Sequence, residues 1–485
     1  MKKNRLFKRL NFLVILLTQF ITITSSAQKP DTSQYITIYD VLDNVNKHHP
    51  ITYSSFLQLQ YAQANQQKAS GSFDPLIQYD FKQKNFDTKN YYQNQFFEVD
   101  FNTKTPLMPI IGYENNSGDF INPETTTGNS GLSYVGFEFS ALKNLITDQR
   151  RTAFRQAKVF QAQSDIVQRQ MIQNLHLNIW SQYISWYVFE EQKNILNTSI
   201  ELSNKRQIAI RKLFSAGGCS GFDTLETSVQ LTQFITKQKE ISIFSEKTKI
   251  LFTSHLWNSI KNNNGIEFTP VLIKSNIVPS NKFFEILESK FMLQNMNSDS
   301  LILFQPDLQY YVQKSNSLKL DIKLKQSYTL PKFDLKYQYL TNDLSRFSSD
   351  NLINNHRFGL SFSAPLYFRS SRGELKTAKL KLIENDFETT LKQREIDSKL
   401  LALKKQTLAY KEILEMLKNV ETGYYQLYQM EIKKFESGDG TIFLLNSRES
   451  KYLEAKLKTI EQFGKYMISL TEYFRVLGTI QSIIS

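Results

Sequence analysis

The chain of 485 residues has few of the residues that interrupt regular structure. It contains 17 glycines and 11 prolines, and these residue types are the strongest breakers of helices and strands. Its hydrophobic content is 41%, which is too low for a protein that crosses a membrane as a bundle of helices. We therefore expect long uninterrupted helices that lie outside any bilayer.

Cysteine is also nearly absent, and sequence motifs for catalysis are missing. The single Cys219 cannot form a disulfide within the chain, and an exported protein of this size does not need one. The five histidines show no HExxH spacing, and the chain has no phosphate-binding GKS or GKT loop and no GxSxG elbow. The pair His48-His49 precedes Pro50, which is more typical of a helix end than of a metal site. The sequence predicts a non-enzyme without cofactor or metal.

Long apolar runs are confined to the N-terminus. Residues 1–9 are basic, residues 10–23 are largely apolar, and Ser25-Ser26-Ala27 supplies the small residues that precede a cleavage site. This pattern predicts a secretory signal peptide over residues 1–27 rather than a membrane anchor, because a bilayer needs about 20 apolar residues. Since no other stretch approaches 18 apolar residues, the mature chain could enter a membrane only as strands.

The basic charge is spread along the chain. The formal net charge is +13, and removal of the five basic residues of the signal peptide leaves +8. No run of five like charges occurs, which favours a dispersed, solvated surface over a nucleic-acid-binding patch.

Four segments alternate between apolar and polar residues with period two, near 75–84, 133–140, 331–341 and 356–364. Successive side chains of a strand point to opposite faces, so each segment would have one apolar face. A soluble sandwich would turn these apolar faces inward. Four strands cannot close a sheet, so we expect several copies to pool their strands into a membrane barrel. The side chains expected to face lipid are Ile77, Tyr79, Phe81, Val135, Phe137, Phe139, Phe333, Leu335, Tyr337, Tyr339, Phe358, Leu360 and Phe362.

Most of the remaining sequence predicts helix. Residues 147–214 contain no proline or glycine, and residues 374–437 contain only Gly423. Each run would span on the order of 100 Å as one helix, or form two shorter helices in line. Apolar residues recur at spacings of four and three from Ile396 to Phe435 and from Leu453 to Leu477, which is typical of a coiled-coil seam. Glycine-containing turns near 215–223 and 436–442 predict the tips of two helical hairpins.

The two halves of the chain share an order of landmarks. Ala157-Lys158 recurs as Ala378-Lys379 and Gly217 recurs as Gly438, both 221 residues later. The proline before the first alternating segment recurs 256 residues later, which leaves 35 extra residues in the first half, within residues 85–132. This extra sequence predicts a surface loop or an added hairpin, and the alternation from Phe96 to Phe101 could be a further strand. We interpret the order as an internal duplication, with repeats at 28–265 and 266–485.

These features together resemble the TolC family of outer membrane efflux proteins, over roughly residues 35–482. The resemblance rests on the two hairpin turns, on the prolines before the strands and on one proline-leucine pair. The residues that carry it are Phe214, Gly217, Asp223, Leu225, Phe435, Gly438, Ile442, Leu445, Pro75, Pro331, Pro365 and Leu366.

The resemblance implies a mainly helical fold, in which a long coiled-coil barrel joins a transmembrane β-barrel shared between subunits. Each subunit of a homotrimer would give four strands to a twelve-stranded barrel in the outer membrane of a Gram-negative bacterium. The helices would extend into the periplasm and meet a periplasmic adaptor (a membrane fusion protein) linked to an inner-membrane pump. The chain would be the passive exit duct of a tripartite efflux or type I secretion system.

The resemblance also implies roles for the hairpin turns. A periplasmic gate is expected at Asp223, Asp439 and Glu436, although helix capping alone would also explain Asp223. Where family members often carry acidic residues in the second turn, this sequence has Leu444 and Ser447. The turn and adaptor contacts are expected at Phe214, Gly217, Gly218, Phe435, Gly438 and Gly440.

Three other classes of protein remain as alternatives. A periplasmic coiled-coil scaffold or adhesin without a pore would have soluble strands. A basic protein of membrane surfaces or nucleic acid would bind with strong salt dependence. A secreted enzyme has no supporting motif. The sequence does not identify the cargo or the pump.

Overall fold

The computed structural model describes residues 35–262, 265–273, 277–293, 305–342 and 353–480. The predicted signal peptide, residues 1–27, lies outside the described residues. The chain divides into two compact units. Unit 1 contains the residues up to His49, Ile179–Met292 and Tyr410–Ile468, and unit 2 contains Pro50–Asn178, Leu293–Ala409 and the residues from Ser469.

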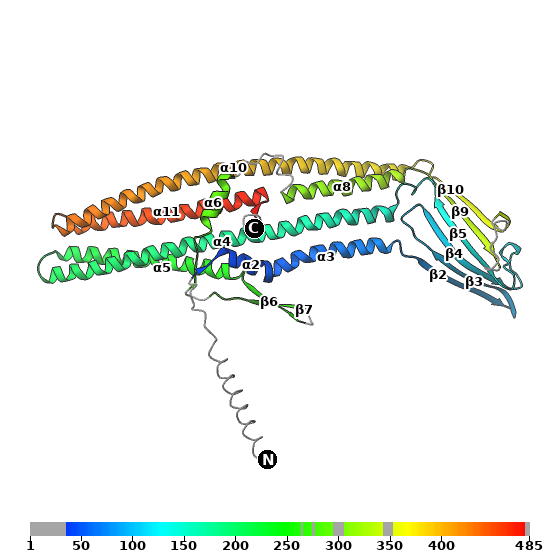
Figure 1. Ribbon diagram of the computed structural model, residues 1–485, viewed down its shortest axis with the longest axis horizontal. Helices are drawn as coiled ribbons and strands as arrows, with labels where there is room; N and C mark the ends of the chain where they lie inside the picture. Colours follow the sequence, from blue (N-terminus) through cyan, green and yellow to red (C-terminus); the bar gives the residue numbers. More distant parts are fainter. Residues whose placement is uncertain (1–34, 263–264, 274–276, 294–304, 343–352, 481–485) are drawn as a thin grey trace, which may run out of the picture. The chain divides into compact units, whose positions relative to one another are not determined.

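Most of the described residues are helical (Figure 1). The two longest helices each take part in both units: α4 is Gln149–Ser215, with 67 residues, and α10 is Arg369–Glu436, with 68 residues. Each is a single helix, so the prediction of long uninterrupted helices is confirmed and the alternative of two shorter helices in line is wrong.

Unit 1 is built on two helical hairpins. The C-terminal part of α4 is followed by α5 (Gly221–Thr253), and the C-terminal part of α10 is followed by α11 (Ile442–Leu477). The connections lie within the predicted turns 215–223 and 436–442. The helices pack along apolar seams, and one cluster joins Leu196 and Phe234 of the first hairpin to Leu453 and Leu457 of the second. Gly464 of α11 allows a close approach, because a Cβ there would lie 2.6 Å from a methyl group of Val188.

Two short helices and two small sheets complete unit 1. The helices are α2 (Ile38–His48) and α6 (Phe284–Leu293). The parallel pair is β1 (Tyr35–Ile36) with β8 (Val278–Pro279), and the antiparallel pair is β6 (Trp257–Asn262) with β7 (Gly265–Pro270). The expectation of helix is confirmed for α2 and α6 and is wrong for these four short strands. Runs of two to six residues are too short for a clear period-two pattern, although Asn262 and Gly265 are turn-forming residues.

Unit 2 contains one antiparallel sheet of six strands in the order β10-β9-β5-β4-β3-β2 (Figure 1). The four predicted strands are present, but the expected number is wrong. The two additional strands form a hairpin within the extra sequence of the first half, which is therefore an added hairpin and not a loop. The strands are β2 (Leu76–Phe86), β3 (Lys89–Asp100), β4 (Leu107–Ser117), β5 (Leu132–Ser140), β9 (Lys332–Thr341) and β10 (His356–Ser363).

Helices of matched length precede the strands of unit 2. α3 (Pro50–Gly71) and α8 (Pro306–Ser327) have 22 residues each. Side-chain amides tie α8 to the long helices, because Gln156 of α4 donates to the carbonyl of Ser317 and Asn385 of α10 donates to that of Tyr311. A single turn of 3-10 helix, η1 (Pro123–Thr125), lies between β4 and β5. Among the described helices, none is long and apolar enough to cross a membrane.

Candidate functional site

The sheet of unit 2 has one apolar face. Residues directly opposite each other in an antiparallel sheet share a face, and the register aligns Ile77, Val99, Ile111, Val135 and Tyr339 in one row across five strands. All thirteen side chains predicted to meet lipid lie on this face by register. Several are strongly exposed, with Ile77 at 66% and Phe362 at 63%, whereas Tyr339 is the buried member at 5%.

The opposite face is polar, and several of its side chains are buried. Glu98, Asp334 and Gln338 are 8%, 5% and 2% exposed. Their partners are also polar: Ser140 donates to Asp334 over 2.8 Å, and the Lys336 ammonium lies 3.8 Å from Glu98. A sheet folded for water would bury its apolar face and expose its polar face. This sheet has the reverse arrangement.

The polar face is concave. Arg357 on β10 makes a two-pronged contact with Glu114 on β4, at 2.7 and 3.2 Å. These strands are separated by β9 and β5, so in a flat sheet they would lie roughly 14 Å apart. The two side chains can meet because the sheet curves toward its polar face. The apolar face is therefore convex.

A tyrosine on the polar face ties three strands together. Tyr134 of β5 is 1% exposed and extends across β4 to donate a hydrogen bond of 2.7 Å to Glu98 of β3. Its ring lies over Gly112 of β4, where an added Cβ would be 2.1 Å from the ring. Only glycine leaves room for the ring at this position.

The first hairpin turn, in unit 1, is set by glycine and by a capping box. Gly217 has a φ of +77°, which favours glycine, and the next amide, that of Gly218, donates to the carbonyl of Leu213. Ser220 then caps α5: its hydroxyl accepts from the amide of Asp223, whose carboxylate accepts from the Ser220 amide at 3.0 Å. Asp223 therefore has the capping role, and its gate role stays a prediction.

The second turn has similar geometry. Gly438 has a φ of +83°, and the amides of Asp439 and Gly440 donate to the carbonyl of Lys434. Gly440 packs against the backbone, since a Cβ there would lie 2.8 Å from the amide nitrogen of Phe435. Glu436 and Asp439 are exposed on this turn.

Large apolar side chains are exposed around both turns. Phe214 is 49% exposed, Phe222 is 69% exposed and Phe443 is 60% exposed. Apolar groups left in solvent beside a turn are typical of a surface that contacts another protein. Phe435 differs, because it packs against a cluster formed by Ile210, Tyr428, Ile442 and Leu445.

A buried polar network, not anticipated from the sequence, joins the two hairpins. Arg206 of α4 contacts both carboxylate oxygens of Glu449 on α11, at 2.5 and 3.0 Å, and the two side chains are only 13% and 4% exposed. The Arg206 guanidinium also donates to Tyr428 of α10 and to Asn446 of α11, and Gln230 of α5 donates to Glu449. Burial opposes the charge of Arg206, but the hydrogen bond and charge of Glu449 outweigh burial and raise the pKa of the guanidinium.

Two histidines near the end of α2 have separate environments. His48 bonds to Ser259 on β6 through Nδ1 at 2.8 Å. His49 is buried and its ring stacks on His255, with 5.9 Å between centroids. Burial, and then the neighbouring His255, lower the pKa of His49 to about 4. Within the described residues, no group of three or more histidine, cysteine or acidic side chains is arranged to hold a metal.

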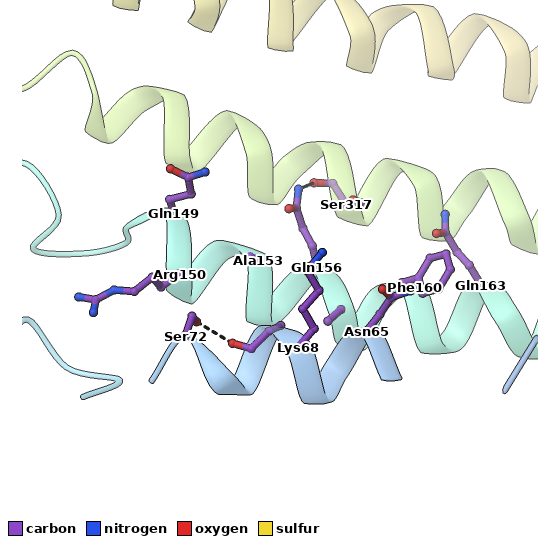
Figure 2. Close-up of a pocket in the computed structure, with 12 residues that line it drawn as sticks. Asn65, Lys68, Ser72, Gln149, Arg150, Ala153, Gln156, Phe160, Gln163 and Ser317 are labelled. Carbon is purple, nitrogen blue, oxygen red and sulfur yellow. Dashed lines mark hydrogen bonds between the residues drawn. The ribbon is translucent and has the colours of Figure 1, made fainter. Parts of the chain in front are cut away.

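A cavity of about 650 Å³ lies in unit 2 between α3, α4 and α8. Figure 2 shows Gln156 of α4 reaching Ser317 of α8 at its edge. The charged side chains among the described lining residues are Lys68 and Arg150, and the remainder are amides, hydroxyls, alanines and Phe160. This lining offers no carboxylate pair and no nucleophile with an adjacent base among the described residues.

Comparison with protein-family models and with curated protein sequences found no match. Solved structures match over most of their length. The Campylobacter jejuni CmeC outer membrane channel has a TM-score of 0.61 at 12% identity, over 91% of this chain and 85% of CmeC. The Vibrio cholerae outer membrane protein VceC has a TM-score of 0.60 at 11% identity, over 90% and 95%. The open state of the Neisseria gonorrhoeae MtrE outer membrane channel has a TM-score of 0.60 at 11% identity, over 91% and 89%.

The chain therefore has the fold of the outer membrane channels. The resemblance predicted from the hairpin turns, the strands and their order is confirmed as a likeness of fold.

Proposed function

We propose that this chain is the subunit of an outer membrane channel of the TolC family, and that it serves as the passive exit duct of a tripartite efflux or type I secretion system. The mature subunit would be anchored in the outer membrane of a Gram-negative bacterium by the sheet of unit 2 and would extend into the periplasm. The transported substrate would be driven by a partner pump and not by this chain.

The observation that carries the proposal is the reversed polarity of the sheet. Its convex face exposes aromatic and aliphatic side chains, including Phe358, Leu360 and Phe362, while its concave face buries Glu98 and Gln338. Lipid outside and water inside would stabilise both faces at once. The thirteen side chains predicted to face lipid would form the outer surface.

The sheet is incomplete in one chain, which supports a homotrimer that shares one barrel. Every residue of the two edge strands β2 and β10 is exposed, and unpaired strand edges are not stable within a bilayer. The duplication into repeats 28–265 and 266–485 would supply each subunit with two equivalent helical hairpins. Its support is the matched length of α3 and α8 and of α4 and α10.

The hairpin turns would contact a periplasmic adaptor that links the duct to an inner-membrane pump. The exposed Phe214, Phe222 and Phe443 support a protein contact at this surface. The backbone geometry of Gly217, Gly218, Gly438 and Gly440 would hold the turns in shape for it.

The same turns would form a gate lined by Asp223, Asp439 and Glu436. Substitution of Asp439, whose side chain is exposed, separates a gate role from a capping role. Asp439→Asn should lower the cation preference of single channels in lipid bilayers while leaving the thermal stability unchanged. Asp223→Asn is the comparison variant, because it also weakens the capping box. An unchanged ion preference in both variants would refute the gate.

A direct test is purification of the mature protein with and without detergent. The proposal predicts an outer membrane fraction, a detergent-dependent trimer and ion conductance in planar bilayers. The alternative, a periplasmic coiled-coil scaffold or adhesin without a pore, predicts a water-soluble protein that does not conduct. A soluble monomer without conductance would overturn the proposal.

A further inference from the structure

Among the described residues of the second half of the chain, the hairpin of β3 and β4 has no counterpart, yet it lies within the sheet, between β2 and β5. We propose that this hairpin is part of the membrane wall, so that each copy of the chain contributes six strands to the shared barrel. Three copies would then form a barrel of 3 × 6 = 18 strands. This inference rests on the proposed function, including its three copies.

In the row through Ile77 the apolar face continues across the hairpin, and farther along β3 and β4 the polar Gln95 and Asn115 occupy the same face. Val99 of β3 and Ile111 of β4 lie in register between Ile77 of β2 and Val135 of β5. Ile111 is 45% exposed, and Phe97 and Leu107 of the hairpin are exposed on the same face. A hairpin that stood in water above the membrane would have no reason to align an exposed apolar band with those of its neighbours.

The polar face of the hairpin is anchored to the other strands. Glu98 of β3 accepts a hydrogen bond from Tyr134 of β5, and Glu114 of β4 pairs with Arg357 of β10. Gly112 of β4 provides the space that the Tyr134 ring occupies. These contacts hold the hairpin in the curved wall, with its acidic groups on the concave side.

The lengths of the strands agree with this assignment. β3 and β4 have 12 and 11 residues, compared with 11 in β2 and 10 in β9. A transmembrane strand needs about 9–11 residues. The added strands are therefore as capable of crossing the bilayer as the four that recur between the halves.

The directions of the two edge strands allow neighbouring copies of the chain to join into a closed barrel. Neighbouring strands are antiparallel throughout the sheet, so the two edge strands β2 and β10 run in opposite directions. The β10 strand of one copy can then pair antiparallel with the β2 strand of the next, which is a head-to-tail contact that closes a ring. Barrel diameter grows roughly linearly with strand number, so 18 strands would make a pore about one and a half times as wide as 12.

The number of strands per copy can be counted directly. Electron cryo-microscopy of the purified oligomer in lipid nanodiscs should show six membrane strands for every copy of the chain, with β3 and β4 at the level of the lipid. Four membrane strands per copy, with the hairpin outside the lipid, would overturn the inference and leave the proposed function in place. The absence of a barrel would overturn both the inference and the proposed function.

A pair of substitutions in β3 tests the same point without a structure. Phe97→Lys places a charge on the apolar face, and Asn94→Lys, three residues before it, places one on the polar face. Phe97→Lys should lower the amount of folded oligomer in the outer membrane at least about tenfold, while Asn94→Lys should leave it within about twofold. Equal effects of the two substitutions, in either direction, would overturn the inference. Val135→Lys on β5 tests the proposed function separately, because tolerance there would argue against any lipid-facing wall.

Discussion

The sheet of unit 2 and the helical hairpins of unit 1 follow opposite rules of burial. In the hairpins, apolar residues such as Leu196, Leu453 and Leu457 are buried. In the sheet, Leu360 and Phe362 are exposed while Glu98 and Gln338 are buried. The hairpins have the pattern of a protein surrounded by water, and the sheet has the pattern of a wall between lipid and water. The two parts of the chain therefore have residue patterns that fit two different surroundings.

The largest effect that we expect in unit 1 comes from a departure from this pattern. The pair Arg206–Glu449 is a buried charge pair inside the water-adapted hairpins. Arg206→Met should destabilise the local fold by about 3–5 kcal/mol, because it leaves a buried carboxylate without its cation. Hydrogen exchange of residues 200–215 and 442–453 would measure the change.

The double variant Arg206→Met with Glu449→Leu provides the control. It should recover most of the loss, since a well-packed apolar pair of similar volume often replaces a buried ion pair without cost. Arg211→Met, at an exposed position on the same helix, should change stability by less than about 0.5 kcal/mol. An Arg206→Met variant with unchanged exchange would show that the network does not hold the hairpins together.

A second prediction concerns pH, and it also belongs to unit 1. Because burial and His255 lower the pKa of His49 to about 4, the folded state binds fewer protons than the unfolded state, in which the pKa is about 6.5. Stability should therefore be complete above pH 6.5 and should fall as the pH drops toward 4, by on the order of 1–2 kcal/mol at pH 5. Hydrogen exchange of α2 at pH 7 and pH 5, corrected for intrinsic rates, checks this in the wild type and in His49→Asn. An equal loss in both would assign the pH dependence to other groups.

A third and smaller effect contrasts two glycines in the hairpin helices. Gly464→Ala should destabilise by about 1–3 kcal/mol, because the added Cβ would lie 2.6 Å from a Val188 methyl group. Gly423→Ala in α10 should stabilise by up to about 1 kcal/mol, because nothing lies within 4 Å and alanine favours a helix. Thermal unfolding of the two variants in parallel would show opposite signs. Shifts of the same sign would contradict the packing described here.

The parts of the fold that repeat a simple period could be predicted from the sequence. The period-two alternation identified the strands β2, β5, β9 and β10. The spacing of four and three residues identified the helices α10 and α11. Pro109 and Gly112 interrupt the alternation in β4, so the sequence analysis left a surface loop or an added hairpin as alternatives there. Pro109 is tolerated because it lies at the end of the pairing with β3, where its carbonyl accepts a hydrogen bond from the Phe101 amide. Gly112 is needed by a residue 22 positions away, Tyr134. Such a requirement depends on tertiary contact and leaves no local signal.

The buried network was missed for a related reason. Arg206 and Glu449 are 243 residues apart, so no local pattern pairs them. A partial signal did exist: continuing the seam upstream from Leu453 by four and then three residues reaches Glu449 and Asn446. Polar residues at seam positions indicate a buried polar contact, but they do not identify the partner.

The central claim, that the convex face of the sheet meets lipid, is tested most directly by two neighbouring residues of β10. Leu360 and Ser361 are both exposed in one chain and point to opposite faces. The account predicts that Leu360→Arg, at a cost of about 2–4 kcal/mol, prevents assembly of the detergent-resistant oligomer in the outer membrane, whereas Ser361→Arg leaves assembly intact. Equal yields of assembled protein from the two variants would contradict it.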